Sequence, residues 1–293
     1  MRPNSIVVCM AALAWALPGA TREHVFPSDV RVERDVAYLG PARHQKADLY
    51  FPRPGAQGKQ LPAVVIIHGG GFNGGHKDGK REIIIGSTLA RQGYVGMSID
   101  YQLWNKGVRK PTWPQCLHDA KRAVRWLRQN ADRLGIASDR IGVIGGSAGG
   151  NLAAMLGVTG PGDGLEPPEG DSGPSTAVQC VVDLYGVVDL VHYHDMRMFL
   201  ATREEDPESY RRASPVNYCG SGDAPVLIMH GTADETVALS QSETFARALQ
   251  EAGVESELII VPDAPHSFGL DYSRYDVKTP VIAFLDRHLA ASP

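Results

Sequence analysis

The sequence has few cysteines and none of the cysteine or histidine spacings that build metal sites. Its four cysteines, Cys9, Cys116, Cys180 and Cys219, form no CxxC pair and no Cys/His cluster. Structural zinc sites and disulfide-dense scaffolds both need such clustering, so neither is expected to organise the fold. The pattern favours buried free thiols and leaves open whether any two of Cys116, Cys180 and Cys219 pair. We expect no metal and no cofactor.

The chain also lacks runs of basic residues. Its 29 Lys and Arg residues are interspersed with 33 Asp and Glu residues, and the formal net charge is −4. Proteins that bind nucleic acid usually carry a basic stripe or patch, so nucleic acid is not an expected partner. The apolar stretch at residues 6–17 is too short to cross a bilayer, and no stable membrane span is expected.

The first 20 residues have the layout of a secretory signal peptide. Arg2 precedes the apolar stretch, and a Pro-Gly-Ala sequence at 18–20 follows it. We place the cleavage site loosely between Gly19 and Thr21, because a proline occupies a position where a small residue is preferred. The sequence therefore predicts a secreted or periplasmic protein. A start codon assigned too early and a short apolar helix that stays attached are the alternatives.

The overall composition is that of a globular protein with a large core. Of the 293 residues, 43% are hydrophobic and 21% are charged. Beyond residue 30, short β-branched runs alternate with longer stretches of helical period. This alternation is typical of βα units in an α/β fold with a mostly parallel central sheet flanked by helices. No internal repeat or linker divides the chain, so residues 21–293 are expected to form one domain.

The apolar runs define the expected elements. Strands are expected at 47–51, 63–67, 94–99, 141–144, 178–185, 224–229 and 257–261, and helices at 117–134, 148–158, 240–252 and 279–289. Residues 160–175 are rich in Gly, Pro and acidic residues and are expected to form a mobile surface loop. From 187 to 223 the pattern breaks into short polar and aromatic pieces, which we interpret as a small lid.

A candidate nucleophile lies between an apolar strand and a helix. Gly145-Gly146-Ser147-Ala148-Gly149 matches G-x-S-x-G in the strand–turn–helix context that this motif requires. The tight turn needs small flanking residues and places Ser147 at the positive end of the following helix. The alternative is a glycine-rich phosphate cradle, but the sequence lacks G-x-x-x-x-G-K-[ST].

A second glycine-rich loop follows the expected strand at 63–67. In His68-Gly69-Gly70-Gly71-Phe72, consecutive glycines allow backbone N–H groups to converge on one point, at the strand end where open α/β sheets bind ligands. In acyl-transfer enzymes, one oxyanion donor comes from such a loop and another from the residue after the nucleophile. We therefore predict Gly70 and Gly69, in that order, and Ala148 as the oxyanion hole. The alternative is a flexible turn without a role.

A serine nucleophile needs a base, and the base needs an acceptor that fixes its tautomer. Asp234 follows the expected strand at 224–229, and His266 follows the last expected strand at 257–261. The order Ser147, Asp234, His266 is the one found on this scaffold. We therefore predict these three residues as the catalytic triad.

Other acidic residues and histidines compete for these roles. Asp189 follows a strand and is the main competitor of Asp234, whereas Asp119 lies near a helix start, where capping accounts for it. His68 and His230 end buried strands and are interpreted as packing or hydrogen-bonding residues. The remaining histidines considered are His192 and His194 in the lid, which could touch substrate but precede the expected position of the base, and His288, a surface residue.

A short polar segment could be mistaken for a metal site. His76, Lys77 and Asp78 lie together, but we interpret them as part of a polar surface loop.

Several motifs together carry a resemblance to a known family. With HGGGF, GGSAGG, HGTADETV and APHSFG in order, the chain resembles α/β-hydrolases of the hormone-sensitive-lipase-like group, and more closely bacterial esterases of the BD-FAE type, which are related to feruloyl and acetylxylan esterases. The match covers about residues 30–290. It implies Ser147, Asp234 and His266 as the triad and Gly70 with Ala148 in the oxyanion hole. Phe72 stands where many relatives have Trp, and Gln102 where many have Arg.

These observations lead to a functional hypothesis. We expect a secreted serine carboxylesterase that forms an acyl-enzyme on Ser147 and hydrolyses short-chain or aromatic acyl esters. The substrate would be a small-molecule or oligosaccharide ester, and plant-polysaccharide esters are suggested by the resemblance and the expected export alone. An arylformamidase or peptidase of the same fold is one alternative, and a catalytically silent binding module is another. Acyl preference, lid conformation and oligomeric state stay open.

Overall fold

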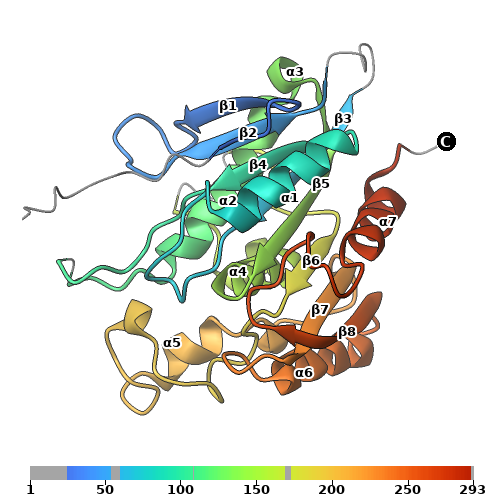
Figure 1. The fold of residues 1–293 in the computed structure, drawn as a ribbon. Coiled ribbons are helices and arrows are strands. Elements are labelled where there is room, and N and C mark those ends of the chain that lie inside the picture. The colour runs from blue at the N-terminus through green and yellow to red at the C-terminus, as the bar shows by residue number, and fades with distance from the viewer. Residues whose placement is uncertain (1–24, 54–59, 108, 169–172, 292–293) are drawn as a thin grey trace, which may run out of the picture.

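An eight-stranded sheet with helices on both faces forms the centre of the molecule (Figure 1). The computed structural model describes residues 25–53, 60–107, 109–168 and 173–291, and the expected signal peptide lies outside them. The strand order is β1-β2-β4-β3-β5-β6-β7-β8. β2 pairs antiparallel with β1 and β4, and every other neighbouring pair is parallel. The predicted mostly parallel α/β architecture is therefore confirmed.

Seven of the eight strands occur where apolar runs predict them. The bounds are β1 Arg31–Val36, β2 Ala47–Phe51, β3 Leu61–Ile67, β4 Val95–Ile99, β5 Ile136–Gly146, β6 Val181–Leu184, β7 Val226–Ala233 and β8 Ser256–Pro265. The unpredicted strand is β1, whose sequence RVERDV has no apolar run and no buried residue. It forms the outer edge of the sheet, where one strand face and one strand edge can stay in water.

The helices surround this sheet. Their bounds are α1 Lys80–Arg91, α2 Gln115–Gln129, α3 Ala131–Leu134, α4 Ala148–Val158, α5 Pro207–Arg212, α6 Leu239–Glu251 and α7 Lys278–Leu289, with 3₁₀ turns at η1 Pro161–Asp163, η2 Arg197–Phe199 and η3 Pro215–Asn217. The helix expected at 117–134 is in fact α2 and α3. It is interrupted at Asn130, whose side-chain amide donates to the Trp126 carbonyl oxygen at 2.9 Å and so competes with the backbone.

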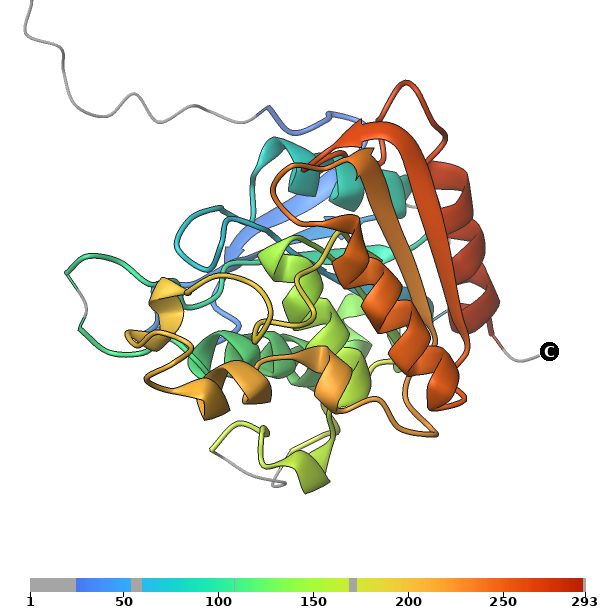
Figure 2. The same cartoon turned by 90° about the horizontal axis from the view of Figure 1, so that it is seen from below.

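The two faces of the sheet carry separate apolar clusters. Along β3, Val65 and Ile67 pack into a cluster with residues of α2, α4 and α6, whereas Val64 and Ile66 pack into a cluster with residues of α1 and α7. Figure 2 shows this layering from below, with β8 between α7 on one side and α6 on the other. Alternate burial on both faces explains why the central strand is a continuous apolar run.

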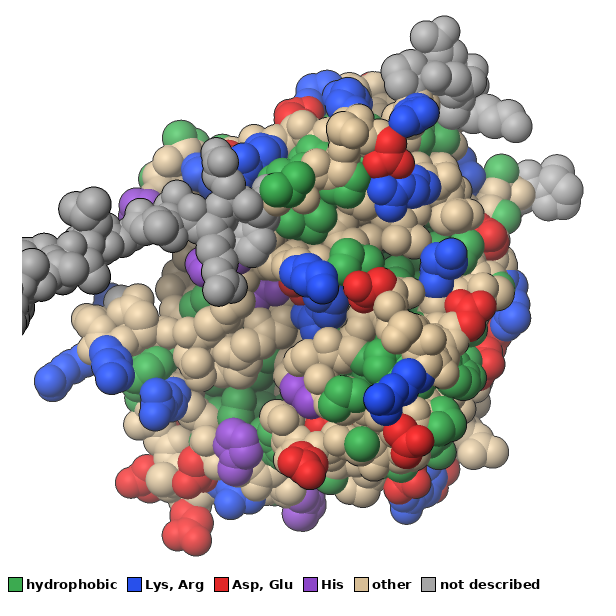
Figure 3. Space-filling model, in the orientation of Figure 1, with side chains coloured by type: hydrophobic (Ala, Val, Ile, Leu, Met, Phe, Trp, Pro, Cys, Tyr) green, Lys and Arg blue, Asp and Glu red, His purple; other side chains and the backbone are tan. Residues whose placement is uncertain are grey.

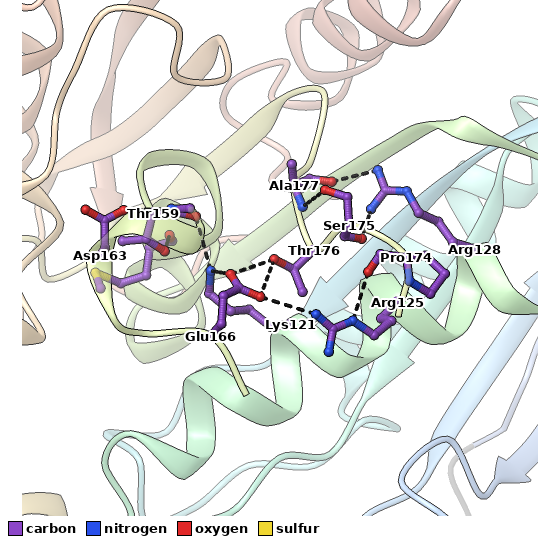
Figure 4. Close-up of polar contacts among 12 residues, drawn as sticks. Lys121, Arg125, Arg128, Thr159, Asp163, Glu166, Pro174, Ser175, Thr176 and Ala177 are labelled. Atoms are coloured by element: carbon purple, nitrogen blue, oxygen red, sulfur yellow. Dashed lines mark hydrogen bonds and ion pairs between the residues drawn. The ribbon is translucent and has the colours of Figure 1, made fainter. Parts of the chain in front are cut away.

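A buried ion pair joins α2 to the segment that connects α4 with β6 (Figure 4). The Lys121 ammonium is fully buried, lies 2.6 Å from Glu166 Oε1 and donates to the Thr159 carbonyl oxygen at 3.1 Å. Thr176 donates to the same carboxylate, and Arg125 donates to the Pro174 carbonyl oxygen at 2.9 Å. Residues 161–164 are exposed, as expected for a surface loop, whereas Glu166, Pro174 and Thr176 are bound to α2 or to one another.

The segment at 187–223 leaves the sheet after β6 and returns at β7. It contains η2, α5 and η3, and it buries Met198, Phe199 and Tyr210. Among the described residues, no helix is both long and apolar enough to cross a membrane.

Candidate active site

Ser147 occupies a sharp turn between β5 and α4. Its backbone has φ 58° and ψ −122°, a conformation that costs energy for a residue with a side chain. The flanking glycines permit this turn, because a Cβ at Gly145 would collide with the Gly149 carbonyl oxygen and a Cβ at Gly149 would collide with the Ile67 carbonyl oxygen. The serine side chain is therefore held at the carboxyl edge of the sheet, as the G-x-S-x-G pattern predicts.

Two other polar residues meet Ser147 at this edge. Asp234 directly follows β7 and His266 directly follows β8. His266 Nε2 lies 3.0 Å from Ser147 Oγ, and His266 Nδ1 lies 2.7 Å from Asp234 Oδ2. A carboxylate can only accept, so Nδ1 carries the proton and Nε2 is free to accept the serine hydroxyl proton. The structure thus brings the three predicted residues into one hydrogen-bonded chain.

The Asp234 carboxylate is held in place from several sides. Its side chain is 1% exposed, and Oδ1 accepts the backbone N–H groups of Thr236 and Val237, each at 2.9 Å. His230 Nε2 lies 2.9 Å from the Val237 carbonyl oxygen and 3.3 Å from Asp234 Oδ2. Burial lowers the pKa of His230, which favours the neutral ring. His230 is therefore a hydrogen-bonding residue, as predicted, and it also packs beside the acid.

The loop after β3 lies against Ser147. A Cβ at Gly69 would lie 3.2 Å from the Ser147 Cβ, and Gly70 has φ 113°, which strongly favours glycine. The Gly70 carbonyl oxygen accepts the N–H groups of Asn73 and Gly74 and so tightens the loop. Ala148 is the first residue of α4, where a backbone N–H has no acceptor within the helix. All three predicted oxyanion residues line one cleft with Ser147.

The competing acids have other partners. Asp189 Oδ2 lies 2.7 Å from His192 Nδ1. Asp119 is not a cap but a fully buried residue inside α2. Its carboxylate binds Arg43 at 2.7 Å and accepts the Gln102 N–H at 2.9 Å, so it fixes the loop that follows β4.

Two residues expected at the surface are covered instead. Lys77 is 5% exposed and pairs with Asp48 of β2 at 2.9 Å and with Asp35 of β1 at 3.0 Å, whereas the neighbouring His76 is exposed. The side chain of His288 is 12% exposed, and its ring lies 4.6 Å from that of Phe284. Cys116, Cys180 and Cys219 are free thiols.

Two residues of the site were not predicted from the sequence. Tyr185 directly follows β6 and is fully buried, and its ring packs edge-on at 4.9 Å against His266. Its hydroxyl donates to the Phe268 carbonyl oxygen at 2.6 Å and accepts from Arg81 Nη1 at 2.8 Å. Arg81 in turn pairs with Glu82 at 2.6 Å. The only sequence feature that could have pointed to Tyr185 is its position after a strand. Arg81 lies in α1, a helix that no clear apolar stripe predicts.

The site opens into a cleft of 710 Å³. Its walls come from the loop after β3, the start of α1, the 187–223 segment and the loop of His266, and the apolar residues among them are Phe72, Val187 and Met196. Among the described residues, no group of three or more His, Cys, Asp or Glu side chains could hold a metal ion.

Comparison with protein-family models shows which family the chain belongs to. The BD-FAE family model matches residues 47–249, more than half of the sequence, including Ser147 and Asp234. The chain belongs to the BD-FAE family. The resemblance stated from its motifs is thus confirmed.

Curated relatives of this BD-FAE member include two esterases of Mycobacterium tuberculosis. Esterase LipQ is 31% identical over 267 residues, which cover 87% of this chain and 60% of LipQ, and Esterase LipC is 30% identical over 72% of this chain and 54% of LipC. Isoprenylcysteine alpha-carbonyl methylesterase ICME of Arabidopsis thaliana is 27% identical over 81% of this chain and 57% of ICME. The chain spans a little over half the length of these relatives.

Solved structures with the same fold are also esterases. A truncated carbohydrate esterase from gut microbiota superposes with a TM-score of 0.77 at 25% identity, covering 91% of this BD-FAE member and 99% of that chain. Esterase 2 of Thermogutta terrifontis, phosphonylated by sarin, superposes with a TM-score of 0.72 at 27% identity, covering 90% and 98%. The fold is that of the α/β-hydrolases.

Proposed function

We propose that the protein is a serine carboxylesterase, with Ser147 as nucleophile, His266 as general base and Asp234 as the acid that orients the base. The observation that carries this proposal is the hydrogen-bonded chain from the Ser147 hydroxyl through His266 to the buried Asp234 carboxylate, at the floor of a cleft. Family membership and the esterase relatives support it.

The geometry suits a two-step acyl transfer. Ser147 Oγ attacks the ester carbonyl carbon while His266 Nε2 takes its proton, and Asp234 stabilises the imidazolium that forms. The backbone N–H groups of Gly70, Gly69 and Ala148 donate to the oxyanion of the tetrahedral intermediate. His266 returns the proton to the leaving alcohol oxygen, which leaves an acyl ester on Ser147. A water molecule, deprotonated by His266, then attacks this ester. The bond from the acyl carbon to Ser147 Oγ breaks, His266 returns the proton to Oγ, and the carboxylic acid is released.

The apolar residues of the cleft lining support short-chain or aromatic acyl groups as substrates. Phe72, Val187 and Met196 supply its apolar surface, and the proposed lid at 187–223 contributes Tyr193 to Arg197. Oligosaccharide esters, including those of plant polysaccharides, fit the carbohydrate esterase among the structural neighbours. The proposal includes secretion directed by a signal peptide at residues 1–20. N-terminal sequencing of protein from the culture medium tests it, and the secreted chain should begin near Thr21.

Replacing the nucleophile tests the reaction. Ser147→Ala should lower kcat for p-nitrophenyl acetate by at least about 10³-fold, because no other hydroxyl of the described residues is bonded to His266 Nε2. Circular dichroism should show an unchanged fold. Ser240→Ala, at an exposed serine of α6, is the matched control and should retain wild-type turnover. Retained turnover in Ser147→Ala would refute the assignment, and formamide and peptide substrates tested in parallel would separate an esterase from a formamidase or peptidase.

A further inference from the structure

Positively charged side chains outnumber negatively charged ones in the lining of the cleft. Arg81 is paired with Glu82, and Asp195 is paired at 3.2 Å with Arg203, whose hydrogen bonds also hold the pKa of Asp195 below its usual value. Two charged side chains of the lining then remain, Lys80 and Arg197. Both are exposed, both are positive, and neither forms an ion pair with any residue that the structure describes.

Arg197 is held at the mouth of the cleft by an aromatic ring. It begins η2, and its guanidinium carbon lies 5.3 Å from the centre of the Trp104 ring. The main chain at Trp104 is fixed, because its backbone N–H donates to the Phe72 carbonyl oxygen at 2.9 Å. A guanidinium stacked on an aromatic face keeps its N–H edge free to bind a planar anion.

Further positive charge lies beside this mouth. The loop between β4 and α2 carries Lys106, Arg109 and Lys110, all exposed and without an ion pair among the described residues. The backbone N–H of Trp104 holds one end of this loop against the cleft. The backbone N–H of Thr112 holds the other end against the 187–223 segment, by donating to the Met198 carbonyl oxygen at 2.9 Å. Figure 3 shows Lys and Arg side chains gathered where this loop projects at the left of Figure 1.

We propose that the cleft selects esters that carry a carboxylate, and that Lys80 and Arg197 bind this carboxylate at the mouth while the ester carbonyl lies at Ser147. This inference rests on the proposed esterase function and names its substrate class. Lys80 and Arg197 leave the charged lining of the cleft net positive in a protein whose formal net charge is −4. Such a local field raises the concentration of anionic substrate and its rate of association. A carboxylate also matches the two parallel N–H donors of a guanidinium.

Matched pairs of substrates test this selectivity. Mono-4-nitrophenyl adipate and 4-nitrophenyl hexanoate share the leaving group and acyl length, and they differ by a carboxylate on the acyl side. 3-Acetoxybenzoate and 3-acetoxybenzamide place the same difference on the alcohol side. In the wild type, kcat/KM should be about 10-fold or more higher for the anionic member of at least one pair, mainly through KM. Raising NaCl from 0.02 to 0.5 M should reduce this ratio, because salt screens exposed charges.

The variant K80Q/R197Q should bring this ratio close to one, because neither cation is left to bind the carboxylate, and circular dichroism should show an unchanged fold. K278Q/R247Q is the matched control, since Lys278 is also an exposed first residue of a helix and Arg247 is also exposed, and neither lines the cleft. It should keep the wild-type ratio.

The outcomes separate the two proposals. If the wild type turns over 4-nitrophenyl hexanoate in a Ser147-dependent manner but shows no anionic preference in either pair, the inference fails and the esterase proposal stands. An anionic preference that survives in K80Q/R197Q, or that is lost equally in the control, also overturns the inference. If Ser147→Ala hydrolyses the neutral ester as well as wild type, the proposed function itself fails.

Discussion

At the scale of single residues, hydrogen-bond partners distinguish Asp234, the proposed acid of the triad, from its competitor Asp189. Asp234 is 1% exposed, binds His266 Nδ1 at 2.7 Å and accepts two backbone N–H groups through its other oxygen. The Asp189 carboxylate is bound instead to the backbone and ring of His192, at 3.2 and 2.7 Å. Both residues follow strands, so sequence position alone could not separate them.

This difference in partners predicts unequal effects of the same substitution. Asp234→Asn should lower kcat for p-nitrophenyl acetate by about 10⁴-fold, because an amide donor beside Nδ1 favours the wrong tautomer of His266. Asp189→Asn should change kcat by less than about 5-fold, because its carboxylate does not touch His266. Steady-state kinetics of the two variants decide the matter, and a larger loss in Asp189→Asn would reassign the acid.

At the scale of elements, a buried charge pair joins α2 to the chain that follows α4. The Lys121 side chain is fully buried and that of Glu166 is 11% exposed, and burial lowers the pKa of Lys121. Removing one member of such a pair leaves the other charge without its main partner in a medium of low polarity. The connection therefore depends on both residues (Figure 4).

Lys121→Met should lower the free energy of unfolding by about 3 kcal/mol, and Lys121→Met/Glu166→Gln by clearly less than the sum of the two single variants. Urea unfolding followed by circular dichroism measures all three. Hydrolysis of p-nitrophenyl acetate at 25 °C should stay at the wild-type rate, because neither residue lines the cleft. Additive losses of stability would contradict a direct pair.

The elements also show where sequence patterns were informative. Continuous apolar runs predicted the central strands, and α4 occupies the predicted residues 148–158. The pattern failed at α1, whose buried face includes Glu82, Gly86 and Ser87, so no apolar stripe marks it. Ser147, Asp234 and His266 each follow a strand that an apolar run predicts, so their order and spacing could be recognised in the sequence. The hydrogen bond between Tyr185 and Arg81 joins α1 to the end of β6. The two residues are far apart in the sequence, so no local sequence pattern predicts this contact.

At the scale of the whole molecule, one core carboxyl group links stability to pH. Asp183 in β6 is fully buried, and one of its oxygens accepts the Gly186 N–H at 2.9 Å while Oδ2 has no partner among the described residues. Burial raises the pKa of Asp183 from 3.8 to about 7. The folded state therefore holds this proton where the unfolded chain has lost it, so the stabilising contribution is full below pH 4 and is lost as pH rises through about 7.

Asp183→Asn keeps the acceptor for Gly186 and removes the titration. Relative to wild type, this variant should gain up to about 4 kcal/mol in unfolding free energy between pH 4 and pH 8, since each pKa unit corresponds to about 1.4 kcal/mol. Urea unfolding of both proteins at pH 4, 6 and 8 measures this change. A difference between them that stays constant with pH would contradict the buried titration.

The architecture as a whole brings three strand ends to one edge of the sheet, so the central claim is that Ser147 is activated there by His266. Reaction with a fluorophosphonate probe, followed by peptide mass spectrometry, tests it most directly. The account predicts a single adduct on Ser147 that forms at least about 10²-fold more slowly in His266→Ala. An adduct on another residue, or labelling of Ser147 at an equal rate in both proteins, would contradict it.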